Sequence, residues 1–216
     1  MSTEHLLLRI PAILLALTVH EYAHGWIASL RGDTTARDMG RLTFNPIAHL
    51  DFFGTIMLLF GPFGWAKPVP VNYQNLKDSK TDPIFISAAG PVSNIILACV
   101  AGYLYRLFFM NQSLFGLSAG DVGIFFSFLI QINLGISFFN LLPVPPLDGS
   151  KILLGLLPSS KVPTYHRYMR KVPMIFLLLI IIEWYFNIPT ISLILYPLYN
   201  PYRSFWLYII FGGKAI

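Results

Sequence analysis

Five apolar runs separated by short polar segments limit most strongly what this chain can fold into. They cover residues 6–30, 84–110, 122–142, 172–186 and 191–210. The first three are long enough to cross a bilayer as helices, and the last two are interpreted as a hairpin turning at residues 187–189. With 55% hydrophobic and 12% charged residues, the composition is far from that of a soluble domain. We therefore expect an all-α polytopic membrane protein with about five transmembrane helices, forming a single membrane-embedded domain over residues 1–216.

The distribution of basic residues predicts the orientation of the chain. Lys and Arg follow the first and third runs, whereas residues 111–120 contain neither. Because cytoplasmic loops keep an excess of Lys and Arg, we place the N-terminus outside and the segments after these two runs in the cytoplasm. The net charge of +5 is therefore interpreted as loop charge that orients the protein, and no nucleic-acid partner is expected.

The stretch between the first two long runs does not fit an ordinary crossing. Residues 52–65 are apolar, but about 14 residues are too few to span a bilayer as a helix. Basic residues lie on both sides of this stretch, so the chain returns to the side that it left. We expect a re-entrant segment, followed at residues 67–72 (KPVPVN) by extended chain, because the prolines restrict this stretch to an edge.

A cluster of ionisable residues interrupts the first apolar run. His20 and His24 are four residues apart, which places them on one face of a helix, where both can bind a single zinc ion. Glu21 is then close enough to act as general base on a water molecule at the zinc ion. Ionisable residues deep in a membrane helix are costly and therefore indicate function. The alternative interpretation is a hydrogen-bonded histidine pair that faces a helix bundle.

A catalytic zinc site needs a third protein ligand beside the two histidines. Three residues are candidates for that position: Asp148, Asp51 and His49. Asp148 stands out because helix-breaking prolines present it just beyond the third run, where non-helical backbone needs a cavity or protein cover. As an isolated motif, however, Leu-Asp-Gly is also typical of a simple loop turn.

Several motifs together resemble one known family, the bacterial and archaeal site-2 proteases, which are zinc metalloproteases that cleave within membranes. In chain order these motifs are HEYAHG at 20–25, GRLTFNPIAHLD at 40–51, FGWAKPVPVN at 63–72, AAGPVSN at 88–94 and NLLPVPPLDG at 140–149. Carried over by motif, the resemblance implies one zinc ion per chain, with His20, His24 and Asp148 as its ligands and Glu21 as the general base. It also implies that Asn140 lies near the metal and helps to hold the substrate peptide or the oxyanion.

The resemblance also implies an architecture and a location. It implies a three-helix catalytic core, here residues 6–153, with the zinc inside the bilayer of a prokaryotic cell membrane and an opening to the cytoplasm. The C-terminal hairpin at 172–210 is less diagnostic. With no recognisable PDZ-like segment, the chain is similar to the short members of the family.

The substrates that the resemblance implies are single-span membrane proteins, such as anti-sigma factors or remnant signal peptides. The bilayer itself is a further partner, and a homo-oligomer is left open. A transmembrane helix must unwind locally before it can be cut. We expect the unwound substrate to pair as an added strand with the extended segment, which consists of Lys67, Pro68, Val69, Pro70, Val71 and Asn72.

Two other classes of function are alternatives to a protease. One is a metal transporter that uses His20, His24 and Asp148, although a second set of ligands forming a path is not apparent in the sequence. The other is a catalytically silent membrane scaffold. Glu21 separates these classes, because a zinc site needs it for hydrolysis but not for binding the metal.

Overall fold

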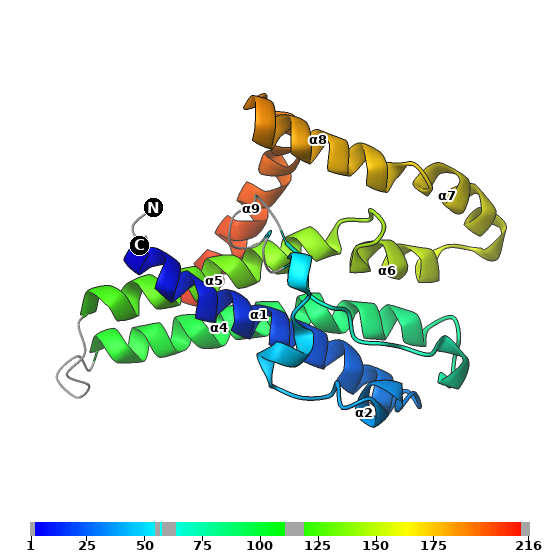
Figure 1. Ribbon diagram of the computed structural model, residues 1–216, viewed down its shortest axis with the longest axis horizontal. Coiled ribbons are helices and arrows are strands. Elements are labelled where there is room, and N and C mark those ends of the chain that lie inside the picture. Colours follow the sequence, from blue (N-terminus) through cyan, green and yellow to red (C-terminus); the bar gives the residue numbers. More distant parts are fainter. Residues whose placement is uncertain (1–2, 55–56, 58–63, 111–118, 213–216) are drawn as a thin grey trace.

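The computed structural model describes residues 3–54, 57, 64–110 and 119–212, and these residues are predominantly helical (Figure 1). This confirms the all-α class predicted from the apolar runs. The α-helices are α1 (Thr3–Leu30), α2 (Thr35–Asp38), α4 (Asp82–Met110), α5 (Ala119–Leu141), α6 (Asp148–Leu156), α7 (Val162–Met169), α8 (Val172–Phe186) and α9 (Ile191–Phe211). The short 3₁₀ turns are η1 (Pro46–His49), η2 (Tyr73–Asn75) and η4 (Ser159–Lys161).

Helices α1, α4 and α5 pack together as the core of the molecule, and α9 lies against α4 and α5 (Figure 1). Small side chains let these helices approach closely. A Cβ atom on Gly102 of α4 would lie 2.1 Å from Cγ2 of Ile210, so only glycine allows α9 to pack at this distance. The buried apolar cluster between these helices consists of Ala12, Ala98, Ala101, Leu129, Ile130, Leu134 and Ile210.

Two or three parts of the described chain meet the length and composition of a membrane span. Among the described residues, Asp82–Phe108 and Gly120–Leu141 are long and apolar enough to span a bilayer. The pair Ser159–Phe186 and Ile191–Phe211 raises the count to three if it is taken as one bent span. Helix α1 has 28 residues, but its histidines and Glu21 lower its hydropathy. The predicted five crossings therefore stay a prediction, and most of the predicted re-entrant segment lies outside the described residues.

The C-terminal helices meet at the predicted turn, but they do not form an antiparallel hairpin. The chain bends by 101° between α8 and α9, with Asn187 in the left-handed conformation (φ 53°). The carboxylate of Glu183 accepts hydrogen bonds from the backbone amides of Thr190 (3.0 Å) and Ser192 (2.9 Å). These amides lie at the start of α9, where an acceptor is needed. Glu183 therefore fixes the corner between the two helices.

An ion pair and a buried carboxylate hold the C-terminal end of α1. Arg31 pairs with the buried Asp82 at the start of α4 (3.4 Å), and its guanidinium lies 4.3 Å from the ring centre of Phe85. Asp33, which is fully buried, accepts hydrogen bonds from the amide of Asn72 (2.7 Å) and from Nδ2 of Asn75 (2.9 Å). The loop after α1 is thus joined to the end of the extended segment.

One expectation about a loop is wrong. Asp148 and Gly149 were expected to form a turn, but they are the first two residues of α6, and the turn lies just before them. A Cβ atom on Gly149 would lie 2.2 Å from the carbonyl oxygen of Leu141, so glycine lets α6 start directly against the end of α5. The basic segment around His166 forms α7. Proline at the second position, where no amide donor is needed, is compatible with this helix start.

Candidate metal centre

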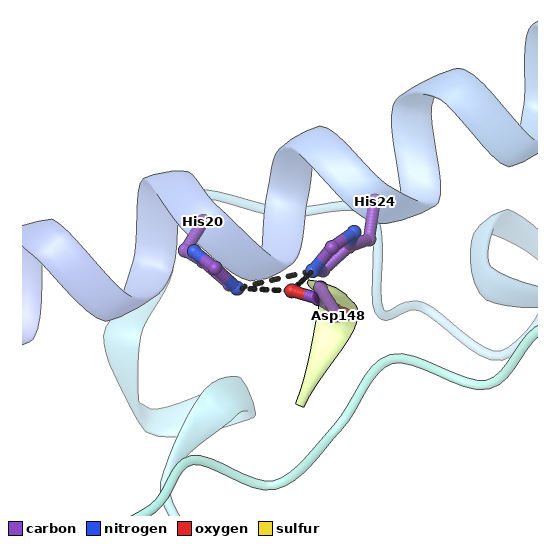
Figure 2. A group of neighbouring side chains, drawn as sticks. All are labelled: His20, His24 and Asp148. Atoms are coloured by element: carbon purple, nitrogen blue, oxygen red, sulfur yellow. Dashed lines mark hydrogen bonds and ion pairs between the residues drawn. The ribbon is translucent and has the colours of Figure 1, made fainter. Parts of the chain in front are cut away.

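Three side chains meet where the start of α6 approaches α1. Figure 2 shows His20 and His24 directed from α1 toward the carboxylate of Asp148. Nε2 of His20 lies 3.2 Å from Oδ2 of Asp148, Nε2 of His24 lies 3.1 Å from the same oxygen, and the two Nε2 atoms are 3.1 Å apart. The structure therefore joins residues that are 128 positions apart in the chain. This is the only group of three or more potential metal-binding side chains found among the described residues.

The spacing of these three atoms fits a zinc ion. In a tetrahedral site with metal–ligand bonds of about 2.0–2.1 Å, neighbouring ligand atoms are about 3.3 Å apart. The observed separations of 3.1–3.2 Å are close to this value. Two imidazoles and one carboxylate are also a donor set that catalytic zinc sites use, with a fourth position left for water or substrate. The residues present therefore fit the metal.

The far nitrogen of each imidazole is held by an oxygen acceptor. Nδ1 of His24 lies 2.6 Å from the backbone carbonyl of Ile86, and Nδ1 of His20 lies 2.6 Å from Oδ1 of Asn94. A carbonyl oxygen can only accept, so Nδ1 of His24 must carry its proton. The lone pair of its Nε2 then points into the centre, as a metal ligand requires.

Gly90 of α4 forms one wall of the centre. A Cβ atom at this position would lie 2.5 Å from Nε2 of His24 and 2.6 Å from Nε2 of His20. Such contacts are too short for any side chain. The space between the two ligand atoms is therefore kept open because residue 90 is a glycine.

The other carboxylate oxygen of Asp148 faces a cation. Its Oδ1 lies 3.2 Å from Nζ of Lys151, one turn later in α6. The Lys151 side chain is 45% exposed, whereas that of Asp148 is only 6% exposed. The contact therefore assigns one oxygen to the histidines and the other to the lysine at the edge of the site.

Glu21 lies beside this centre and is held by the extended segment. Its Oε2 accepts a hydrogen bond from the backbone amide of Val69 (2.9 Å), and both residues are 8% exposed. A carboxylate that accepts an N–H bond in a buried site is fixed in orientation. Among residues 67–72, Val69 is the buried one and the one that touches the proposed catalytic machinery.

The remainder of the extended segment is anchored on both sides of Val69. The amide of Lys67 donates to the carbonyl of His49 (2.8 Å), next to an isolated antiparallel bridge between Leu50 and Ala66. Nη2 of Arg41 donates to the carbonyl oxygens of Lys67 (2.8 Å) and Pro68 (3.3 Å). The predicted extended chain is thus present and attached to the segment before the re-entrant region.

Three other candidate residues lie outside the group around Asp148. Asn140 is half-buried, and its Nδ2 donates to the carbonyl of Ile136 in its own helix (3.1 Å). Nε2 of His49 contacts the carbonyl of Thr43 (2.8 Å), and Asp51 accepts a hydrogen bond from the amide of Gly54 (2.8 Å). Of the three candidates for the third ligand, Asp148 is therefore the one that joins the histidines.

Sequence reasoning missed the contacts that complete the surroundings of the histidines. It did not predict that Asn94, Gly90 or the carbonyl of Ile86 would contact the histidines. Gly90 and Asn94 do lie in the AAGPVSN motif, which was one signal available. The contact of the Ile86 carbonyl could not be predicted, because every residue has a backbone carbonyl whatever its side chain.

Comparisons with known proteins agree with this arrangement. Residues 116–182 match the model of peptidase family M50. Three relatives carry the name "Putative zinc metalloprotease": YwhC of Bacillus subtilis, Rip2 of Mycolicibacterium smegmatis and MJ0611 of Methanocaldococcus jannaschii. Identity to YwhC is 45% over 150 residues, which is 68% of both chains. Rip2 is 30% identical over an alignment that covers 63% of this chain and 52% of Rip2. MJ0611 is 40% identical over an alignment that covers 32% of this chain and 31% of MJ0611.

The comparison with solved structures gives no significant match. The similarity to YwhC covers two thirds of each protein, and the family model matches the stretch that contains Asp148. This stretch supplies the carboxylate that completes the histidine pair of α1. The chain therefore belongs to peptidase family M50, the site-2 protease family, and is a zinc metalloendopeptidase of the membrane.

Proposed function

We propose that this protein cuts peptide bonds in or near the transmembrane segments of single-span membrane proteins. The observation that carries the proposal is the triangle of ligand atoms from His20, His24 and Asp148, with Glu21 beside it. This polar group lies among helices of predominantly apolar composition. Ionisable side chains in such a setting are retained for function, and the family assigns that function to peptide hydrolysis.

The proposed chemistry divides between the ligands and the base. His20, His24 and Asp148 would hold one zinc ion, which when bound supplies a Lewis acid that acidifies water and polarises the scissile carbonyl. Glu21 takes the proton of the attacking water and passes it to the leaving amine. The Val69 amide holds the carboxylate in place while it does so.

The extended segment suggests how an unwound substrate binds. In extended chain, neighbouring residues direct their backbone groups to opposite sides. The amides of Lys67 and Val69 are used inside the protein, so Pro68 and Pro70 lie on the other edge. Proline has no N–H, so this edge offers only carbonyl acceptors, and the carbonyl of Pro68 already accepts a hydrogen bond from Nη2 of Arg41 (3.3 Å). The substrate strand must supply the donors, which limits pairing to one side of the segment.

The proposed setting is a prokaryotic cell membrane, with the N-terminus outside and the active site open to the cytoplasm. The basic residues after α1 and α5 support this orientation. Substrates of the proposed class are single-span proteins, such as anti-sigma factors or remnant signal peptides. A transmembrane substrate must lose helical hydrogen bonds at the cut, so prolines placed near that position should leave processing intact.

The experiment uses purified protein in liposomes with a model single-span substrate, and mass spectrometry locates the cut. We expect cleavage within or at the edge of the transmembrane segment, and prolines beside the cut should preserve it. A metal transporter is the alternative from another class, so zinc flux into the same liposomes is measured in parallel. Zinc flux without cleavage would overturn the proposal, and so would cutting confined to parts of the substrate far from the bilayer.

A further inference from the structure

Two buried amide side chains form a hydrogen-bonded chain behind His20. Asn94 of α4 and Asn133 of α5 are both 0% exposed. Oδ1 of Asn94 lies 2.6 Å from Nδ1 of His20, and Nδ2 of Asn94 lies 2.7 Å from Oδ1 of Asn133. The chain thus connects the three core helices at the level of the metal centre.

Backbone carbonyls at the two ends of this chain determine its direction. Nδ2 of Asn133 lies 2.7 Å from the carbonyl of Leu129, and Nδ2 of Asn94 lies 3.0 Å from the carbonyl of Ala16. Because a carbonyl oxygen only accepts, both amides must turn their NH₂ groups toward these ends. Asn133 then presents its oxygen to Asn94, and Asn94 presents its oxygen to His20.

This direction selects one tautomer of His20. An oxygen opposite Nδ1 requires the ring to donate from Nδ1, and the lone pair is then on Nε2, which points to Asp148 and His24. In His24, the backbone carbonyl of Ile86 selects the same tautomer, with the proton on Nδ1 and the lone pair on Nε2. The two ligands therefore differ in what fixes their tautomer. For His24 it is a backbone carbonyl, and for His20 it is the side chains of Asn94 and Asn133.

We propose that Asn94, oriented by Asn133, is a positioning residue that holds His20 in the tautomer and ring orientation needed to bind zinc. This inference rests on the proposed zinc site. The competing explanation is that both amides only join helices, as polar side chains in membrane proteins often do. The two explanations make different predictions for substitutions of Asn94.

Asn94→Leu and Asn94→Asp separate the two roles. Leucine has the same branching and number of heavy atoms as asparagine but no acceptor, whereas aspartate retains an oxygen opposite His20 and, when protonated, a donor to Asn133. Loss of the outer partner of a metal-binding histidine typically weakens metal binding 10–100-fold. We expect Asn94→Leu to weaken zinc binding by roughly this factor and Asn94→Asp to remain within a few-fold of wild type. If the amides only join helices, Asn94→Leu should lower the unfolding temperature of the zinc-free protein, because Asn133 and the carbonyl of Ala16 lose their donor, but the folded protein should bind zinc within twofold of wild type.

The measurement is the zinc dissociation constant of detergent-purified protein, obtained by competition with a chelator. The unfolding temperature of the zinc-free protein reports separately on the fold. Asn133→Leu should weaken zinc binding less than Asn94→Leu, and the double variant should be no weaker than Asn94→Leu alone, because the residues act in series. Gln131→Leu is the control, since Gln131 is exposed on the same helix and contacts Ser127. It should bind zinc as wild type does.

Each outcome bears on a separate claim. Zinc binding by Asn94→Leu within twofold of wild type would overturn the positioning role and leave the protease proposal standing. Equal weakening by Asn94→Asp and Asn94→Leu would overturn it as well. Wild-type protein that binds zinc but cleaves nothing would contradict the proposed function, while the differences in zinc affinity among the variants would still test the positioning role.

Discussion

The individual residues around the metal centre show how an apolar helix can contain two metal-binding imidazoles. His20 and His24 each direct one nitrogen to the centre and the other to an oxygen acceptor on α4. Gly90, on the same helix, leaves the space between them open. Helix α4 therefore supplies both the orientation of the ligands and the room for what they bind.

The space opposite Gly90 can be tested directly. Gly90→Ala places a methyl group about 2.5 Å from the two Nε2 atoms, so we expect loss of zinc from the purified protein. Alanine favours a helix by roughly 0.5–1 kcal/mol over glycine, so the zinc-free fold should not be weakened through helix propensity. Gly135→Ala is the matched control, because its new methyl group would meet only the Tyr199 hydroxyl, at 3.9 Å. Full zinc content in Gly90→Ala would contradict this description of the centre.

The lowered pKa of Asp33 predicts that the stability of the folded protein depends on pH. Burial alone would raise its pKa, but hydrogen bonds from Thr35, Asn75 and the amide of Asn72 lower the pKa below the ordinary value of 3.8. A lowered pKa means that the ionised form stabilises the folded state above pH 3.8, and this stabilisation is lost as the pH falls through the lowered value. Asp33→Asn should therefore unfold at a lower temperature than wild type at pH 7.

The difference in unfolding temperature between wild type and Asp33→Asn should narrow as the pH falls below 3.8. Thermal unfolding in detergent over a pH series measures it. Asp78 also has a lowered pKa, because it accepts hydrogen bonds from Thr81 and Lys80. It is present in both proteins, so its contribution cancels in the comparison. A difference that stays constant down to the lowest pH would show that the Asp33 charge does not stabilise the fold.

At the scale of residues, the sequence predicts which side chains form the site but not which groups they contact. The spacing of His20 and His24 is sufficient to place them on one face of a helix. Residue types alone left Asp148, Asp51 and His49 open, and the family motif implied Asp148; the fold shows the physical reason, because the start of α6 brings Asp148 to the histidines. Ile86 contributes through its backbone, and its apolar side chain gives no sign of this.

At the scale of elements, the extended segment is the part that connects the proposed base to the rest of the chain. It is anchored at Lys67 by His49 and Arg41, at Val69 by Glu21 and at Asn72 by Asp33. A movement of this segment would therefore change the hydrogen bond of the base.

The backbone amide of Val69 is the contact to remove. Val69→Pro deletes the donor, and a hydrogen bond to a charged group is worth about 1.5–3 kcal/mol, which corresponds to roughly a 10–100-fold loss of cleavage rate. Zinc content should be unchanged, because the amide of Val69 donates to Glu21, which is not one of the three ligands. Val69→Ala retains the amide and should lose much less activity. Equal losses in both variants would show that the side chain, and not the amide, matters.

The long elements were predictable, whereas the short ones were not. Apolar runs predicted α4 and α5 to within about three residues at each end, because a membrane helix is defined by a sustained apolar composition. Helices α6 and α7 were not predicted. They are 9 and 8 residues long and follow prolines, so helix and loop interpretations were hard to separate. The corner between α8 and α9 was located correctly, but its angle depends on the cap that Glu183 provides.

At the scale of the whole molecule, the proposed orientation in the membrane follows from the distribution of basic residues. The segments proposed to be cytoplasmic contain the basic residues that follow α1 and α5, and the start of α5 lies at the opposite end of the core (Figure 1). Residues 111–118, which complete the proposed outer loop, lie outside the described residues. The single-domain organisation over residues 1–216 stays a prediction.

Cysteine labelling in intact cells tests the orientation. In a Cys99→Ala background, Lys80→Cys and Arg167→Cys should resist a membrane-impermeant thiol reagent until the cells are opened. Gly120→Cys should react from outside, since a side chain there meets open space. Reaction of Lys80→Cys and Arg167→Cys from outside, with Gly120→Cys protected, would reverse the proposed topology.

The measurement that tests the central claim most directly is zinc content together with substrate cleavage for wild type, Glu21→Gln and Asp148→Ala. We predict one zinc ion per chain and cleavage in wild type, and the same zinc content with cleavage reduced by a factor of about 10²–10⁴ or more in Glu21→Gln. Asp148→Ala should lose both. Undiminished cleavage by Glu21→Gln would contradict Glu21 as the base, and full zinc content in Asp148→Ala would contradict Asp148 as the third ligand.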